Sequence, residues 1–122
     1  MSRSQHAARR RPPVWLSPTE WSALERFVDE VRARHGDRIH RMTLFGSRAR
    51  GEGHEESDLD VAVTLTADDH GLRRALIDLA TGIYLDTGIK ISPLVLSQRD
   101  FDALAQMERG IAVAIQHEGV DL

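Results

Sequence analysis

The segment that decides the interpretation of this sequence is GSRARGEGHEESDLD, residues 46–60. It begins with a glycine and a serine, continues through ten residues rich in glycine and charge, and ends in two aspartates separated by one leucine. Glycine lets the backbone approach an anion closely, and a serine hydroxyl together with successive amide groups can hold phosphate oxygens. The first half of the segment is therefore typical of a loop that binds phosphate.

The two aspartates, Asp58 and Asp60, begin a stretch in which apolar residues alternate strictly with other residues up to position 66. Residues two apart on a strand point to the same face, so both carboxylates leave one side with about 7 Å between their α-carbons. Two such charges raise each other's proton affinity unless a cation intervenes, and Mg²⁺ is the usual cation for hard oxygen ligands. The pair predicts a Mg²⁺ site, while aspartates that only begin a strand or cap a turn are the alternative for this short motif.

A helix and a strand are predicted before this segment. Residues 17–20 read Ser-Pro-Thr-Glu, the form of a capping box with proline at the first helical position, and apolar residues follow at helical spacing. We expect this helix to run to about Gly36. Residues 39–45 form a short apolar run that stops at Gly46, which favours a strand.

The residues after the aspartates predict two more helical regions and one more strand. Apolar residues at helical spacing from Leu72 indicate a helix that stops near Gly88. Residues 89–96 are a strand candidate, and Pro93 within them removes a hydrogen-bond donor, which favours an edge strand or a bulge. A C-terminal helical region is expected to begin at residues 97–100, to be interrupted around residue 110 and to end at residue 119.

This order of elements predicts a small α/β (α+β) domain over residues 15–122. We expect a mixed, three-stranded core sheet with helices packed mainly on one face. The length of 122 residues and the 41% apolar content fit a single domain. Residues 1–14 are basic, contain two prolines and lack an apolar run, so we expect a disordered tail and no membrane segment.

The charge and the cysteine content narrow the possible partners. A formal net charge of −3 gives the molecule no basic field of the kind that holds duplex nucleic acid, so nucleic acid is not the expected partner. The chain has no cysteine, which fits a reducing cytoplasm and excludes disulfides and thiolate chemistry.

The spacing of Gly46-Ser47 and Asp58-Leu59-Asp60 resembles the signature of the minimal nucleotidyltransferases of the polymerase-beta superfamily. Ala49-Arg50-Gly51 and Ser57 sharpen the resemblance, which covers about residues 39–96. It implies a Mg²⁺-dependent transfer of a nucleoside monophosphate, most simply AMP from ATP, to a hydroxyl of a protein or a small molecule. Proteins of this kind resemble the antitoxin partners of HEPN ribonuclease toxins, some of which transfer AMP to the toxin.

The predicted site combines both halves of the segment. Asp58 and Asp60 are the expected catalytic residues and metal ligands. The expected nucleotide-binding residues are those of the loop, namely Gly46, Ser47, Arg48, Arg50 and Ser57. The two arginines could neutralise a triphosphate, with ordinary surface arginines as the alternative.

One position departs from the family pattern. Active members usually carry a third acidic residue on the next core strand, and our alignment places Ser92 there. Lys90, expected on the same face, would oppose metal binding. Two functions therefore remain open: a nucleotidyltransferase that works with two carboxylates, and a catalytically impaired binding module that neutralises a partner protein by forming a complex.

Overall fold

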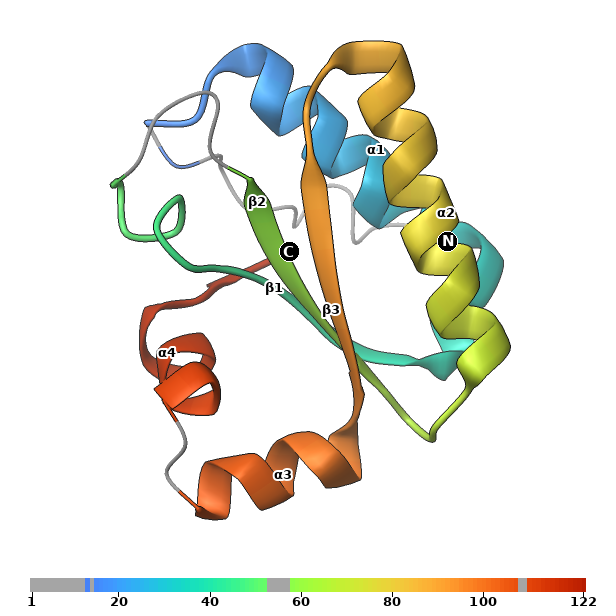
Figure 1. Cartoon of the computed structure of the whole chain (residues 1–122), viewed down its shortest axis with the longest axis vertical. Helices are drawn as coiled ribbons and strands as arrows, with labels where there is room; N and C mark the ends of the chain where they lie inside the picture. The colour runs from blue at the N-terminus through green and yellow to red at the C-terminus, as the bar shows by residue number, and fades with distance from the viewer. Residues whose placement is uncertain (1–12, 14, 53–57, 108–109) are drawn as a thin grey trace.

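The structure is a computed structural model, and it describes residues 13, 15–52, 58–107 and 110–122. Its elements follow one another in the order shown in Figure 1. They are α1 (Pro18–His35), the 3-10 helix η2 (Gly36–Arg38), β1 (Ile39–Phe45), β2 (Leu59–Leu65), α2 (His70–Thr87), β3 (Ile91–Ser97), α3 (Gln98–Gln106), α4 (Gly110–Glu118) and β4 (Val120–Asp121).

The four strands form one mixed sheet in the order β3-β2-β1-β4. β2 runs parallel to β3 and antiparallel to β1, and β4 pairs antiparallel with β1. The predicted mixed α/β architecture is confirmed, but the sheet has four strands rather than three. The missed strand, β4, is two residues long, and it is recognisable only by its pairing with Thr43 and Leu44. β3 lies at the edge of the sheet, as Pro93 predicted.

The first helix, α1, begins with the predicted capping box. The Ser17 Oγ accepts a hydrogen bond of 3.0 Å from the Glu20 amide, and the Ser17 amide donates one of 2.8 Å to the Glu20 Oε1. The helix buries a stripe that includes Leu24, Phe27 and Val31. These residues recur at intervals of three and four, which is the spacing of one helix face.

The helix α2 begins at an Asp69 cap and ends at Gly88, whose φ of 78° is left-handed. It buries Leu72, Leu76 and Ile83, which join the residues of α1 and one face of the strands in a single core. Figure 1 shows α1 and α2 on the same side of the sheet. The two longest helices, of 18 residues each, thus cover one face.

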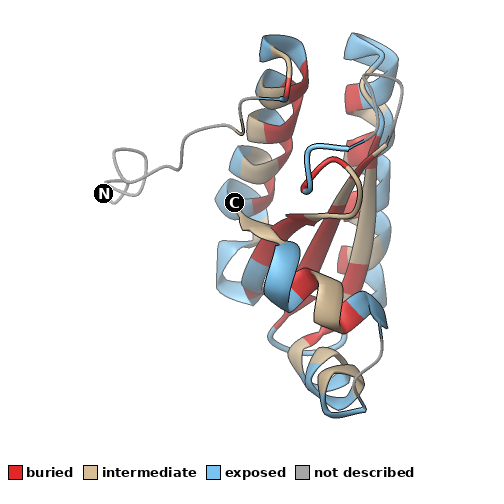
Figure 2. Ribbon diagram, turned by 90° about the vertical axis from the view of Figure 1, so that its left-hand side faces the viewer, coloured by how far each residue is buried: buried red, intermediate tan, exposed pale blue. Residues whose placement is uncertain are grey.

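The short helices α3 and α4 lie toward one end of the other face (Figure 2). Thr43 and Ala62 are paired in register and therefore share this face, and both are buried. Gly119, directly after α4, is so close to Thr43 that a Cβ at residue 119 would lie 2.3 Å from the Thr43 Cγ2. The same face carries Asp60 farther along the strand, where the short helices leave it partly exposed. Within the described part of the chain, no helix is both long enough and apolar enough to span a membrane.

Candidate functional site

The two aspartates lie where β2 begins. Asp58 directly precedes the strand, and Asp60 is paired with Phe45 on β1 and with Ser92 on β3. Burial raises the pKa of the Asp60 carboxyl, and the negative charge of Asp58 raises it further. The two carboxylates are therefore close enough to repel each other, as their spacing predicted.

Gly46 brings the loop against the second of these carboxylates. Its φ is +79°, a conformation that favours glycine. A Cβ built at this residue would lie 2.6 Å from the Asp60 Oδ2, so a side chain here would force this carboxylate to move. The structure thus joins the phosphate-type loop to the aspartate pair through a direct contact between Gly46 and Asp60.

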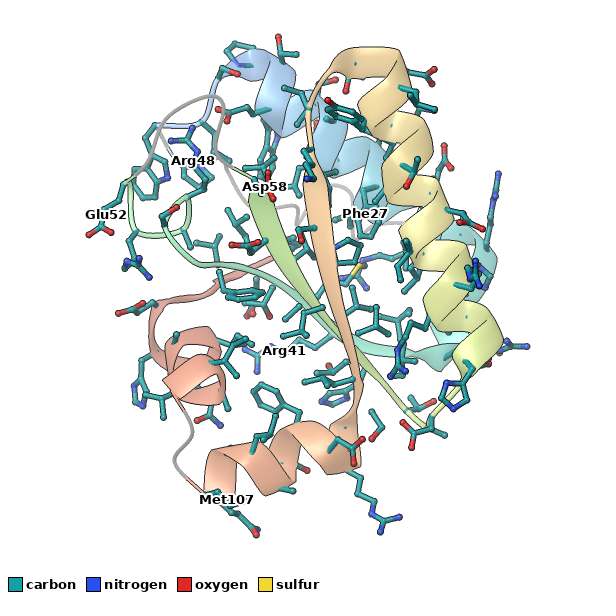
Figure 3. The ribbon with its side chains drawn as sticks, in the orientation of Figure 1. Phe27, Arg41, Arg48, Glu52, Asp58 and Met107 are labelled. Carbon is teal, nitrogen blue, oxygen red and sulfur yellow. The ribbon has the colours of Figure 1, made fainter. Side chains whose placement is uncertain are left out.

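The loop itself is a series of tight turns that follows β1. The Gly46 carbonyl accepts a 3.1 Å hydrogen bond from the Ala49 amide. The Ser47 carbonyl accepts hydrogen bonds from the amides of Arg50, at 3.2 Å, and Glu52, at 2.9 Å. Ser47 is half-buried at the start of this turn. These bonds give the loop a defined backbone shape near the carboxylates, and Figure 3 labels Arg48 and Glu52 on the loop and Asp58 at the start of β2.

Arg48 has a different position from the one expected for a nucleotide-binding arginine. Its side chain is only 4% exposed, and its Nη2 donates to both carboxylate oxygens of Glu20, at 2.8 and 3.0 Å. The Arg48 Nε is buried and has no hydrogen-bond partner among the described residues. A guanidinium enclosed in this way is not available to a phosphate, so we correct the prediction: Arg48 ties the loop to the start of α1.

Arg50, the second predicted arginine, is exposed and forms two ion pairs. Its side chain bonds to Glu52 at 3.1 Å and to Glu118 at 3.2 Å. These hydrogen bonds raise the pKa of the Arg50 guanidinium above its ordinary value. Exposed ion pairs contribute little to stability and re-form readily, so this cation can turn toward an anion. Ser57, the remaining predicted nucleotide-binding residue, lies outside the described residues.

Ser92 of β3 and Lys90, which precedes that strand, lie beside the aspartates. The register places Ser92 directly beside Asp60, and the Lys90 Nζ lies 4.0 Å from the Asp58 Oδ2. The Lys90 carbonyl also accepts a 2.9 Å hydrogen bond from the Leu59 amide, which fixes the position of Lys90 beside the strand start. The start of β3 and the residue before it thus place a serine and a lysine beside the carboxylate pair, not a third acid.

The oxygen donors of this site suit a divalent cation. Asp58 and Asp60 supply two hard carboxylate ligands, and Mg²⁺ is commonly bound by one or two carboxylates with substrate phosphates and water completing the coordination. Among residues 13, 15–52, 58–107 and 110–122, no three His, Cys, Asp or Glu side chains converge into a complete metal cage. The donor set therefore fits a metal that arrives with a nucleotide, although the Lys90 charge opposes it.

Two residues that support the loop, Glu20 and Trp15, carry no signal of that role in the sequence. The Trp15 indole Nε1 donates to the Arg48 carbonyl, and the Trp15 carbonyl accepts a 3.3 Å hydrogen bond from the Arg48 Nη2. The Trp15 ring also lies against Gly51, where a Cβ would be 3.3 Å from the ring. The capping-box motif predicted Glu20 as a helix residue, but it carried no sign of a partner 28 residues away.

The sequence is similar to a family model and to known proteins. Residues 24–108 match the family model described as a nucleotidyltransferase domain. The chain is 36% identical over 84 residues to "Putative protein adenylyltransferase MJ0604" of Methanocaldococcus jannaschii, a match that covers 68% of this chain and 79% of that protein. It is 32% identical over 80 residues to "Putative protein adenylyltransferase MJ1305" of the same organism, covering 63% of this chain and 54% of that protein.

Solved structures show the same fold. A chain described as a "putative minimal nucleotidyltransferase" superimposes with a TM-score of 0.55 and 26% identity, and the match covers 84% of this chain and 92% of that one. A chain from a mutant form of the toxin-antitoxin complex MntA-HpeT superimposes with a TM-score of 0.51 and 20% identity over 80% of this chain and 70% of that one.

Proposed function

The chain belongs to the nucleotidyltransferase domain family, and from this premise we propose that it transfers AMP from ATP to a hydroxyl group of an acceptor protein, with Mg²⁺ as the cofactor. The observation that carries the proposal is the contact of Gly46 with Asp60. It supports a single site in which a loop suited to phosphate meets a pair of carboxylates suited to a metal. Each half supplies what the other lacks for binding a nucleoside triphosphate.

The reaction would be an in-line displacement at the α-phosphorus of ATP. The acceptor hydroxyl oxygen forms a bond to that phosphorus, the bond between the phosphorus and the bridging oxygen to the β-phosphate breaks, and pyrophosphate leaves with the electron pair. The hydroxyl proton passes to a carboxylate or to water. When bound, Mg²⁺ would neutralise phosphate charge and align the reacting groups.

The residues of this chain would divide the work. Gly46 and Ser47 hold the phosphates through the backbone and the hydroxyl, and Ser57 is assigned to the same group by the motif. Arg50 can exchange its exposed carboxylate partners for a phosphate oxygen. Asp58 and Asp60 hold the metal, and burial together with the negative charge of Asp58 raises the pKa of the Asp60 carboxyl.

A protein acceptor is supported by two of the comparisons. The similar Methanocaldococcus jannaschii proteins are named as protein adenylyltransferases, and a solved structure of the same fold is part of a toxin-antitoxin complex. We therefore assign this chain a toxin as its partner, of the HEPN type that the sequence resemblance implies. The cysteine-free composition fits the cytoplasm as the place of action.

The second candidate function is a binding module that neutralises its partner by forming a complex. The observation that favours it is the pairing of Ser92 with Asp60, because a serine neither adds charge to a metal nor serves well as a general base. Lys90 beside Asp58 favours it as well, since its charge competes with a cation.

Intact-mass analysis of the partner separates the two candidates. The protein encoded beside this chain is incubated with the purified chain, ATP and Mg²⁺, and its mass is then measured. A mass increase equal to one or more AMP groups, lost when Asp58 is changed to Asn, supports transfer. An unmodified partner held in a stable complex would instead support the binding module.

A further inference from the structure

The most deeply buried charges among the described residues belong to Glu20 of α1 and Arg48 of the loop. Their side chains are 1% and 4% exposed, and one Nη2 of Arg48 bonds to both oxygens of Glu20. Glu20 also accepts the hydrogen bond from the Ser17 amide at the helix start. The same carboxylate therefore completes the capping box and anchors the loop.

Buried ion pairs are expensive to form, because two charges lose their hydration. The core of this protein is otherwise apolar at this place, with Ala23 and Leu24 next in the same helix. The loss of hydration is offset only where the geometry of the pair is held, and the two short bonds to Glu20 meet that condition. Such a pair specifies one position of the loop more sharply than apolar packing would.

Further contacts extend this pair into a clamp, which we define as Trp15, Glu20 and Arg48. The Arg48 side chain bonds to the backbone carbonyls of Trp15 and Glu52, each at 3.3 Å. In return the Trp15 indole donates to the Arg48 carbonyl, and its ring covers Gly51. The chain at the start of α1 is thus tied to the loop at several points around Arg48.

The clamp lies two residues from the point where the loop touches the carboxylates. Arg48 follows Ser47 and Gly46 directly, and Gly46 lies against Asp60. A change in the position of Arg48 is therefore transmitted to the backbone that faces the phosphates. In contrast, Asp60 is held by the pairing of β2 with β1 and β3, and Asp58 directly precedes β2; neither neighbouring strand contains a clamp residue.

We propose that Glu20 is a positioning residue for nucleotide binding, acting through Arg48 to hold the Gly46–Ser47 backbone in its phosphate-binding shape. This inference rests on the proposed function, because it concerns the same site. It assigns a role to the start of α1, which contains none of the motif residues. It also means that different contacts hold the phosphate loop and the metal ligands in place.

The test changes Glu20 to Gln. Glutamine still fits a capping box, so the helix start is preserved while the negative charge opposite Arg48 is lost. We expect the dissociation constant of Mg²⁺-ATP, measured by calorimetry, to rise roughly tenfold or more, as for the loss of a charged hydrogen-bond partner. The affinity for Mn²⁺ alone, measured by electron paramagnetic resonance, should stay unchanged. A general loss of folding would lower both affinities together.

The matched control is Arg26→Gln. Arg26 lies on the same helix as Glu20, and the change removes its exposed ion pair with Asp86 of α2, at 2.9 Å. It should change neither affinity. Trp15→Phe serves as a second variant, because it keeps the ring over Gly51 and removes only the indole donor to Arg48. We expect it to weaken Mg²⁺-ATP binding in the same direction as Glu20→Gln.

Hydrogen exchange of the amides of residues 46–52 provides a readout that does not depend on nucleotide. Exchange should accelerate in Glu20→Gln and remain unchanged in Arg26→Gln. If the parent protein binds Mg²⁺-ATP and Glu20→Gln binds it equally well, or if loop exchange is unchanged, the positioning role is refuted while the proposed function stands. If the parent itself fails to bind Mg²⁺-ATP, the proposed function is refuted instead.

Discussion

Gly46 and Asp60 are in such close contact that a Cβ at position 46 would lie 2.6 Å from the Asp60 Oδ2, so any other residue there would displace this carboxylate. Gly46 directly follows β1 and Asp60 lies on the adjacent strand, so the contact follows from the antiparallel pairing of β1 and β2. The glycine has a second reason to be there, its φ of +79°. The residue that shapes the loop is therefore also the one that leaves room for the Asp60 carboxylate.

The first prediction concerns Gly46→Ala. The left-handed backbone should cost about 1 kcal/mol of unfolding free energy, and the contact with Asp60 should displace the carboxylate and weaken Mg²⁺-ATP binding. Gly88→Ala is the matched control, because Gly88 has a φ of +78° and no atom within 4 Å of its Cβ position. Chemical denaturation should show a similar loss of stability in both variants, whereas calorimetry should show weaker binding only in Gly46→Ala. Equal nucleotide affinity in the two variants would contradict the importance of the contact.

The second prediction concerns the pH dependence of Asp60. Burial and the charge of Asp58 raise its pKa in the folded state, so the ionised carboxylate destabilises the fold above that pKa. Asp60→Asn should therefore raise the melting temperature at neutral pH. The gain in unfolding free energy should be less than about 1 kcal/mol, because the group is partly exposed. The gain should shrink as the pH falls through the raised pKa and vanish below the ordinary value of 3.8.

Asp69 provides a contrast of opposite sign. The hydrogen bond from the Leu72 amide lowers its pKa in the folded state, so its ionised form stabilises the fold above its ordinary value. Asp69→Asn should lower the melting temperature at neutral pH, and the loss should disappear as the pH falls through the lowered pKa. Melting curves of both variants from acidic to neutral pH would test the pair, and the same sign of change in both would refute it.

The third prediction concerns Ser92→Asp, which places a third carboxylate beside Asp60. We expect tighter Mn²⁺ binding and, if the chain is a transferase, a higher rate of AMP transfer, because the added acid can bind the metal and accept a proton. Without metal the variant should be less stable than the parent, since three like charges repel one another. Ser92→Asn, similar in size and uncharged, is the control. A variant that binds Mn²⁺ no more tightly than this control would show that residue 92 does not face the site.

The fourth prediction concerns Lys90→Gln. The Lys90 ammonium group lies 4.0 Å from the Asp58 Oδ2, and its removal should leave the carboxylate freer to bind a cation. Mn²⁺ affinity should rise a few-fold at low ionic strength, and salt should reduce the difference because the pair is exposed. Arg74→Gln, which removes an exposed charge of α2, is the control and should have no effect. Weaker Mn²⁺ binding in Lys90→Gln would mean that Lys90 organises the site.

Much of the fold follows from signals that are local in the sequence. The capping box fixed the start of α1 because Ser17 and Glu20 satisfy each other's backbone groups without any distant partner. Gly88 marked the end of α2 because the left-handed conformation there favours glycine. The strand β4 was missed, since two residues carry no period and are held by their pairing with Thr43 and Leu44.

The candidate site also combines a feature that local sequence predicts with one that depends on distant partners. The carboxylate pair was predictable, because residues two apart on a strand always share a face. The burial of Arg48 was not predictable, because it depends on the packing of α1 against the loop. From its neighbours in the sequence, Arg48 is simply one of two loop arginines. Partners far apart in the chain are set by tertiary packing, which local patterns do not encode.

The most direct measurement is calorimetric titration of ATP into the parent protein and into the double variant Asp58→Asn, Asp60→Asn, each with and without Mg²⁺. The predicted result is binding by the parent that requires Mg²⁺ and is lost in the double variant, because the proposed function makes the loop and the two carboxylates one site for the metal and the nucleotide. Equal affinity of the parent and the double variant for Mg²⁺-ATP would contradict that conclusion.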